Sequence, residues 1–224
     1  MGTHAMTQRL GRDGVALLVL LGALMSAAAH GQVASQGRAT LSVEFGQGSG
    51  PSGAVAEEIV KQQALPNITQ HSVGWRIAGG YNYADHFGIE TAISRIGYMK
   101  NSAPYLASDS LSTQTVLNVF SIDAVGRLPL TSHFRLDGLL GVAESALITD
   151  VSTALGSSLP VGQSNPVHVR RFGVDGGVNA EWRTSDHLSL LLGYHAYPNV
   201  GSSRVTGSAN GLFSMITGGF HVEF

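Results

Sequence analysis

Hydrophobic residues recur at every second position along most of the chain after residue 39. In the stretch from Val73 to Tyr83, for example, Trp75 and Ile77 alternate with polar or small residues. A period of two places apolar side chains on one face of a β-strand and polar side chains on the other. Eight segments show this pattern, at residues 40–45, 73–83, 87–94, 120–128, 134–142, 171–183, 188–195 and 212–224. We therefore expect an all-β protein of eight strands.

The connections between these segments are of two alternating kinds. The turns near residues 84–86, 130–132 and 184–186 are short. The loops near residues 47–69, 99–113, 147–167 and 198–211 are long and rich in Gly, Ser, Pro and Asn. Short turns on one side and long loops on the other are typical of outer-membrane barrels, and a soluble β-sandwich has no reason to sort its loops in this way. The pattern predicts an eight-stranded antiparallel up-and-down transmembrane β-barrel.

Aromatic residues on the apolar face fall at two levels. If the short turns face the periplasm, the inner level holds Tyr83, Phe87, Phe134, Trp182 and Phe224, and the outer level holds Phe45, Trp75, Phe172 and Tyr194. Amphipathic rings prefer the two membrane interfaces, so two belts around an aliphatic band favour a membrane barrel.

The polar face of the predicted strands carries many charges. If this face lines the lumen, the charges must pair, because unpaired buried charge is costly. The set has seven acids and five bases, which permits a lumen charge network: Glu44, Arg76, Glu90, Asp123, Arg127, Arg135, Asp137, Arg171, Asp175, Glu181, Arg183 and Glu223. An eight-stranded barrel has a lumen just wide enough for side chains to fill, so we expect a filled lumen.

Composition excludes several classes of function. The net charge is −2 and only 12% of residues are charged, which argues against nucleic acid as a partner. The absence of cysteine excludes disulfides and thiolate metal sites. The nine histidines are scattered, and the Gly-rich runs lack a phosphate-loop pattern. We expect no cofactor and no metal.

The N-terminus indicates export. Arg9 and Arg12 precede an apolar run from Val15 to Ala29 that ends in small residues, as in a secretory signal peptide. This run is shorter than the roughly 20 residues that a spanning helix needs. We expect a cleaved signal peptide at residues 1–31, a barrel domain at residues 32–224, and a location in the bacterial outer membrane.

Several stretches resemble the OmpA-like transmembrane domain. They are the hairpin at residues 125–138, the segment from Gly173 to Thr184, the residues 192–195 followed by Asn199-Val200-Gly201, and the last segment from Gly218 to Phe224. The resemblance covers essentially the whole chain after the signal peptide. The longer members of that family continue into a peptidoglycan-binding domain, and this chain lacks it. The resemblance therefore implies a stand-alone small barrel of the porin-like kind, without peptidoglycan anchoring.

Three functions are compatible with the sequence. The first is a structural or surface-interaction protein that is embedded in outer-membrane lipid and displays its four long loops to extracellular partners. The second is a narrow porin-like channel for small solutes. The third is a lipid A-modifying enzyme, for which His195, Ser202 or Ser203, and Glu223 are the candidate groups. The alternation of side chains along the strands disfavours the enzyme, because it places His195 and Glu223 on the polar face, away from lipid. We therefore predict no enzymatic activity and no catalytic residues.

The last strand carries one further motif. Gly218, Phe220, Val222 and Phe224 share the apolar face, and Phe224 ends the chain. An aromatic C-terminus on such a strand resembles the signal that the outer-membrane assembly machinery reads. We expect this machinery to be a partner of the last strand.

Overall fold

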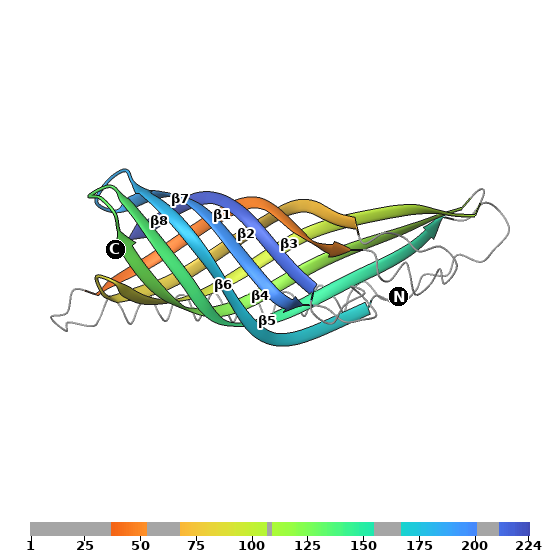
Figure 1. The fold of residues 1–224 in the computed structure, drawn as a ribbon, viewed down its shortest axis with the longest axis horizontal. Coiled ribbons are helices and arrows are strands. Elements are labelled where there is room, and N and C mark those ends of the chain that lie inside the picture. The colour runs from red at the N-terminus through yellow and green to blue at the C-terminus, as the bar shows by residue number, and fades with distance from the viewer. Residues whose placement is uncertain (1–36, 53–67, 107–108, 155–166, 201–210) are drawn as a thin grey trace.

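Eight antiparallel strands form a closed up-and-down barrel (Figure 1). The computed structural model describes residues 37–52, 68–106, 109–154, 167–200 and 211–224. The strands are β1 (Arg38–Ser52), β2 (Ile68–Ala84), β3 (Phe87–Leu106), β4 (Asp109–Pro129), β5 (Phe134–Ala154), β6 (Val167–Arg183), β7 (Leu188–Val200) and β8 (Gly211–Glu223). The predicted fold class is therefore confirmed. The signal peptide expected at residues 1–31 lies outside the described residues.

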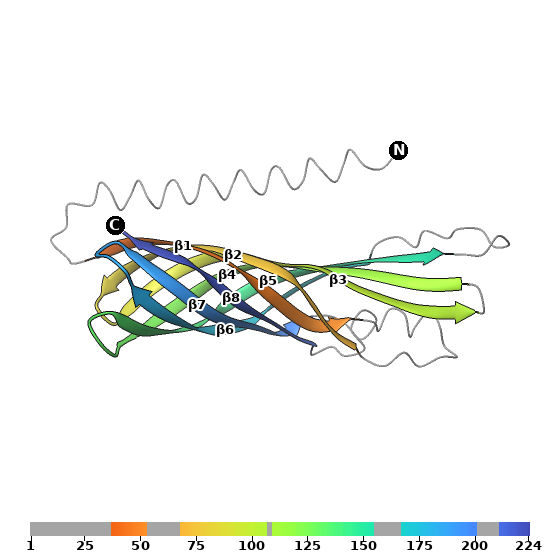
Figure 2. The same ribbon diagram turned by 90° about the horizontal axis from the view of Figure 1, so that it is seen from above.

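The strands are longer than the alternation predicted. β4 and β5 each span 21 residues, and β3 pairs with β4 as far as Leu106 and Asp109. The loop predicted at residues 99–113 is therefore mostly a hairpin, and that prediction was wrong. The cause is that a strand beyond the bilayer has no face that must be apolar, so the period of two disappears. Figure 2 shows β3, β4 and β5 extending past the other strands, at the end away from the C-terminus.

The other three predicted loops are also shorter than expected. β1 continues to Ser52 and β5 to Ala154, while β2 begins at Ile68. What remains of the connections, at residues 53–67, 107–108, 155–166 and 201–210, lies outside the described residues. In the part of the chain that the structure describes, no helix is long and apolar enough to cross a membrane.

The barrel closes where β8 pairs with β1. The register runs from Thr40 opposite Glu223 to Ser49 opposite Ser214. The amide of Phe224 donates to the carbonyl of Ala39 at 2.9 Å. Gly219 lies so close to β1 that a Cβ atom there would fall 2.1 Å from the carbonyl oxygen of Val43. A residue without a side chain is therefore required at this position of the seam.

The strands are strongly tilted, as the pairing shows. Register partners can be followed from strand to strand around the barrel, beginning at Phe87 on β3. This row of partners contains Gly126, Gly138, Val178, Tyr194, Ile216, Gln47 and Val73. Because Gly74 is opposite Ile96, Val73 brings the row back to β3 at Gly97. The row has thus climbed ten residues in one circuit, and this shear fixes which side chains share a level inside the barrel.

The outer surface is apolar, as the alternation predicted. Large side chains on this face are exposed on every strand, for example Phe172 at 84% and Leu140 at 67%. At the end with the short turns, the predicted inner belt contains an edge-on ring pair, Phe134 and Trp182, with centroids 6.5 Å apart. Aromatic pairs in this geometry add stability beyond that of their buried area.

Near the other end, β7 carries an irregularity that changes which side chains face inward. The register with β8 shifts between Tyr197 and Val200, and Asn199 has a φ of 60°. Asparagine tolerates this left-handed conformation better than most residues. The bulge breaks the alternation, so that both Tyr197 and Val200 are buried in the barrel interior, at 2% and 3% exposure.

Candidate functional site in the barrel lumen

Three groups of side chains follow one another along the lumen. The turn-side cluster lies nearest the short turns and contains Arg127, Arg135, Asp137, Glu181, His221 and Glu223. The central cluster contains Glu44, Arg76, Glu90, Asp123, Asp175, His195 and Thr217. The apolar cluster contains Ile96, Leu117, Val119, Ala143, Leu147, Tyr197, Val200, Phe213 and Met215. The order is visible on β8 alone, where Glu223, Thr217 and Phe213 follow one another away from the turns.

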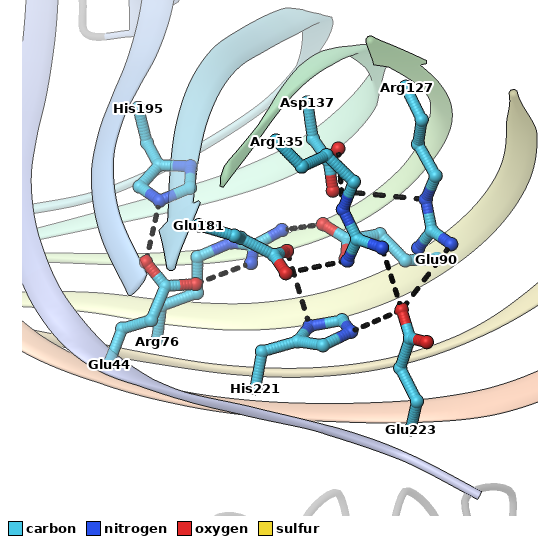
Figure 3. A network of polar contacts seen from close by, with 10 residues as sticks. All are labelled: Glu44, Arg76, Glu90, Arg127, Arg135, Asp137, Glu181, His195, His221 and Glu223. Atoms are coloured by element: carbon cyan, nitrogen blue, oxygen red, sulfur yellow. Dashed lines mark hydrogen bonds and ion pairs between the residues drawn. The ribbon is translucent and has the colours of Figure 1, made fainter. Parts of the chain in front are cut away.

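Arg76 is the hub of the central cluster (Figure 3). Its side chain is 2% exposed and forms ion pairs with Glu44, at 2.9 Å, and with Glu90. Asp123 lies 3.6 Å from the same guanidinium group. These partners come from β1, β3 and β4, so one arginine on β2 joins four neighbouring strands from the inside. A buried charge is tolerated only when it is paired in this way.

Glu44 is fully buried and has three partners. Besides Arg76, its carboxylate contacts Nε2 of His195 at 2.8 Å and accepts a hydrogen bond from Oγ1 of Thr217 at 2.5 Å. His195 comes from β7 and Thr217 from β8, so Glu44 connects the first strand to the last two. The contacts connect β1–β4 to β7 and β8 across the lumen, and the barrel seam is stabilised from within.

The central cluster has more acids than bases. Asp175 lies next to Asp123, and the two carboxylates interact electrostatically. Asp123 accepts a hydrogen bond from Ser121 at 2.8 Å, but its Oδ1 atom and Oδ1 of Asp175 are buried without a hydrogen-bond partner among the described protein groups. Like charges in a buried site repel each other, so this pair opposes folding instead of supporting it.

The turn-side cluster is organised around Arg135. Its guanidinium group donates to Glu223 at 2.8 Å and to Glu181 at 2.5 Å, and lies 3.1 Å from Asp137. His221 lies between the two glutamates, 3.6 Å from Glu181 and 3.7 Å from Glu223 (Figure 3). The cluster closes the lumen at the end with the short turns.

Two further arginines contact the turn-side cluster. Arg127 lies 3.8 Å from both Asp137 and Glu223. Arg38 donates to Glu223 at 3.3 Å, but its side chain is 56% exposed. Pairs this exposed contribute little to stability, whereas breaking the more buried Arg135 pairs lowers the stability of the barrel considerably.

The apolar cluster adds to the lumen a group of side chains that the pattern of charged residues did not indicate. Phe213, Met215, Ile96 and Leu117 are fully buried, and Val169 packs against them. The polar-face pattern missed this group because residues 116–120 and 212–216 contain apolar side chains on both faces. The predicted set of charged residues therefore describes mainly the half of the lumen nearer the short turns.

The structure does not place every predicted lumen charge in a network. Glu44, Arg76, Glu90, Asp123, Arg127, Arg135, Asp137, Asp175, Glu181 and Glu223 lie together in the two clusters. Arg171 is exposed and Arg183 half-buried, and neither forms an ion pair with another described side chain. Both lie toward the ends of β6, where solvent can satisfy a charge.

Sequence reasoning missed several members of the clusters. His221 and Thr217 alternate with the outward apolar residues of β8, so their positions in the strand alone identify them as inward-facing. Arg38 precedes the first predicted strand, and no local pattern marks it. Tyr197, which donates to Ser94 at 2.9 Å, is directed inward together with Val200 by the bulge.

The groups considered for a lipid-modifying enzyme do not form one site. His195 contacts Glu44 in the central cluster, and Glu223 contacts Arg135 in the turn-side cluster. His195 is opposite Met215 on β8, eight residues along the strand from Glu223. Ser202 and Ser203 lie outside the described residues. In the part of the chain that the structure covers, no three His, Cys, Asp or Glu side chains are arranged to hold a metal ion.

Several solved structures are similar to this chain at low sequence identity. Neisserial surface protein A, from Neisseria, is 16% identical, with a TM-score of 0.54 over 83% of this chain and 97% of that one. Ail of Yersinia pestis, solved with the heparin analogue sucrose octasulfate, is 12% identical, with a TM-score of 0.49 over 84% and 99%. OprG of Pseudomonas aeruginosa is 12% identical, with a TM-score of 0.46 over 85% and 97%.

The similarity to the Neisseria protein shows the fold alone. No curated protein matches the chain. The family model described as the outer membrane protein beta-barrel domain matches residues 15–224. This match covers nearly the whole chain and agrees with the closed eight-stranded barrel and its apolar outer face. The chain therefore belongs to the outer membrane protein beta-barrel family, and it is a protein of the bacterial outer membrane.

Proposed function

We propose that the protein is a closed, non-conducting barrel whose function lies in what it presents at the cell surface. The observation that carries the proposal is the double obstruction of the lumen. Solutes would have to pass the ion-paired clusters around Arg76 and Arg135, and then the apolar cluster around Phe213 and Met215. The two obstructions differ in chemistry and lie in series along the axis.

The alternative is a narrow channel for small solutes. Polar atoms that are buried without a protein partner, such as Oδ1 of Asn179 and Nδ2 of Asn82, favour a hydrated path through the turn-side half of the lumen. The apolar cluster opposes a continuous path, because Ile96, Leu117 and Phe213 are packed together with no exposed surface. An ion crossing this layer would lose its hydration without gaining a polar partner.

The third function, a lipid-modifying enzyme, has less support than the closed barrel or the narrow channel. A catalyst that acts on membrane lipid should present its reacting groups to the bilayer. His195 is 3% exposed and directed inward, where Glu44 occupies its Nε2 atom. We therefore infer that these groups serve the structure of the barrel.

Surface presentation is supported by the shape of the barrel. β3, β4 and β5 continue beyond the other strands at the end that carries the long connections (Figure 2). This end faces the exterior if the short turns face the periplasm, as they do in barrels of this type. We propose that partners bind here, at the extensions of β3, β4 and β5 and at the connections predicted near residues 47–69, 147–167 and 198–211.

Single-channel recording tests the proposal. The purified full chain is inserted into planar lipid bilayers, and a known porin in the same membrane confirms that steps of conductance can be detected. We expect no conductance above the background of the bilayer. Reproducible steps that depend on the added protein would overturn the closed-barrel proposal.

Two variants show whether either obstruction acts alone. Phe213→Ala thins the apolar cluster, and Arg135→Ala removes the centre of the turn-side cluster. Because the obstructions lie in series, each variant should remain closed while still showing the heat-dependent mobility of a folded barrel on gels. Conductance in only one of the two would identify that cluster as the gate of a channel.

A further inference from the structure

The outward face carries a ring of polar side chains toward the outer end of the apolar band. On six strands, moving away from the short turns, an outward polar residue directly follows a large apolar side chain, and on β8 and β5 the apolar residues Leu212 and Ile148 lie farther out. Gln47 follows Phe45, Arg95 follows Ile93, and Asn118 follows Phe120. Glu144 follows Val142, Arg170 follows Phe172, and Ser214 follows Ile216. We name these six residues, Gln47, Arg95, Asn118, Glu144, Arg170 and Ser214, the outer polar ring.

The charges of the outer polar ring are concentrated on one side of the barrel. Arg95, Glu144 and Arg170 lie on β3, β5 and β6, while β1 and β8 contribute only the neutral Gln47 and Ser214. The side chain of Arg170 is 75% exposed, and that of Glu144, 3.6 Å away, is 36% exposed. Arg95 is half-buried and is opposite both Trp75 and Asn118 in register. Within the outer polar ring, the β3–β6 side therefore carries two positive charges and one negative charge.

The rim of the apolar band nearer the short turns differs from the outer polar ring in its charge. Its described outward side chains are Ala39, Tyr83, Phe87, Leu128, Phe134, Trp182, Leu188 and Phe224, and none of them is charged. An arginine placed outward at only one boundary of a membrane band is directed at a headgroup, because its stem can follow the apolar surface while the guanidinium group stays in the polar layer.

We propose that Arg95 and Arg170 bind the phosphate groups of lipids in the outer leaflet. Guanidinium groups bind phosphate oxygens through paired, charge-assisted hydrogen bonds, which makes arginine suited to this ligand. The site is continuous with the lipid-facing surface, since Phe172 and Ile93 lie immediately below the two arginines. A phosphorylated headgroup could therefore contact an arginine while its acyl chains lie against the apolar band.

Glu144 should weaken this binding. Its carboxylate contacts Arg170 and would repel a phosphate group brought to the same place. Neutralising Glu144 should therefore increase the preference for phosphorylated lipid, while neutralising either arginine should decrease it. Opposite effects of neighbouring substitutions distinguish a phosphate site from a general effect of the ring on folding.

The chain has two tryptophans, which makes a local measurement possible. In Trp182→Phe, the remaining Trp75 lies opposite Arg95. In the triple variant Trp75→Phe, Trp182→Phe, Phe172→Trp, the introduced indole lies beside Arg170. In Trp75→Phe, the remaining Trp182 reports on the opposite rim. Each full-length variant is reconstituted in vesicles of phosphatidylcholine that contain either phosphatidic acid with brominated chains or phosphatidylcholine with brominated chains, and quenching of tryptophan fluorescence is compared.

We expect phosphatidic acid to quench the two reporters at the outer polar ring more strongly than phosphatidylcholine does, and to show no preference at Trp182. Arg95→Gln should lower the preference for phosphatidic acid about fivefold at Trp75, and Arg170→Gln should do the same at the indole introduced by Phe172→Trp. Glu144→Gln should raise it at the Phe172→Trp reporter. The matched control is Arg171→Gln, which removes the same charge one residue along β6 from the lumenal face and should have no effect.

Two results would overturn the proposal. One is equal quenching by the two brominated lipids at both ring reporters. The other is a loss of preference in Arg171→Gln as large as that in Arg170→Gln, which would show that only the overall charge of β6 matters.

Discussion

Arg76 and Glu44 are opposite each other on adjacent strands, and their side chains form an ion pair of 2.9 Å in the interior of the barrel. Both side chains are almost completely buried, at 2% and 0% exposure. The pair therefore lies between two membrane-spanning strands but has no contact with lipid, and its stability depends on partners across the lumen.

Arg76→Ala should strongly destabilise the barrel. It leaves Glu44 and Glu90 buried without their cation, and breaking a buried pair in this way costs about 3–5 kcal/mol. Urea unfolding in lipid vesicles, followed by tryptophan fluorescence, measures the change. Arg38→Ala is the control, because the exposed Arg38–Glu223 pair should contribute no more than about 1 kcal/mol. Equal effects would show that the central cluster does not stabilise the fold.

Met215→Ala should lower the free energy of unfolding by about 2–5 kcal/mol, because it leaves a cavity in the fully buried apolar cluster. Met215→Leu keeps the volume and should cost less than about 1.5 kcal/mol. The same urea titration compares the two. A lumen that is loosely packed at this level would tolerate both substitutions equally.

Gly219→Ala should destabilise the closing seam. The added Cβ atom would lie 2.1 Å from the backbone oxygen of Val43, so one strand must shift, at a cost of about 1–3 kcal/mol. The adjacent Gly218 faces outward, and there the nearest atom to an added Cβ would be 3.9 Å away. Gly218→Ala should therefore change the unfolding midpoint very little. If both variants unfold at the wild-type midpoint, the β1–β8 contact is looser than described.

Asp175→Asn should stabilise the barrel at neutral pH. It removes the repulsion between Asp175 and Asp123, and it supplies an amide that can donate to a carboxylate. The gain should shrink as the pH is lowered, because protonation of either carboxyl group of the pair then removes the repulsion in the wild type as well. Thermal unfolding of wild type and variant across pH measures this difference. A gain that does not depend on pH would point to packing as its cause.

Phe224→Ala should impair insertion into the outer membrane while export across the inner membrane remains intact. We propose this because the last residue is aromatic, exposed and hydrogen-bonded through its amide to β1. Fractionation of cells expressing the variant measures the inserted and periplasmic pools. Phe45→Ala is the matched control, since Phe45 has nearly the same exposure, 62% against 63%, on the neighbouring strand. Normal insertion of Phe224→Ala would exclude a role for the terminus in assembly.

The number of strands, their faces and their turns could be predicted because they depend on local pattern. In β7, for instance, Leu188, Leu190 and Leu192 face outward because every second residue of a strand does so. The end of each strand nearest the short turns could also be predicted, because the turn sequences carry Asp, Ser and Thr. The extension of β3 and β4 was not visible, because a strand in water need not alternate.

The pairing inside the lumen could not be predicted from sequence. Arg135 and Glu223 are 88 residues apart, and only the shear of the closed barrel brings them to the same level. The apolar cluster was missed for a related reason. Leu117 and Val119 face inward beside the outward Phe120, so this segment shows no contrast between its two faces.

The seam between β1 and β8 also determines how the barrel can fold. Every other seam joins strands that are neighbours in the chain, whereas this one brings Thr40 to Glu223. A contact between such distant residues carries the largest loop-closure entropy and tends to form slowly. The rate-limiting step of folding should therefore be the meeting of the two chain ends of the barrel. Until they meet, β1 and β8 each leave one edge of backbone donors and acceptors unpaired in the bilayer.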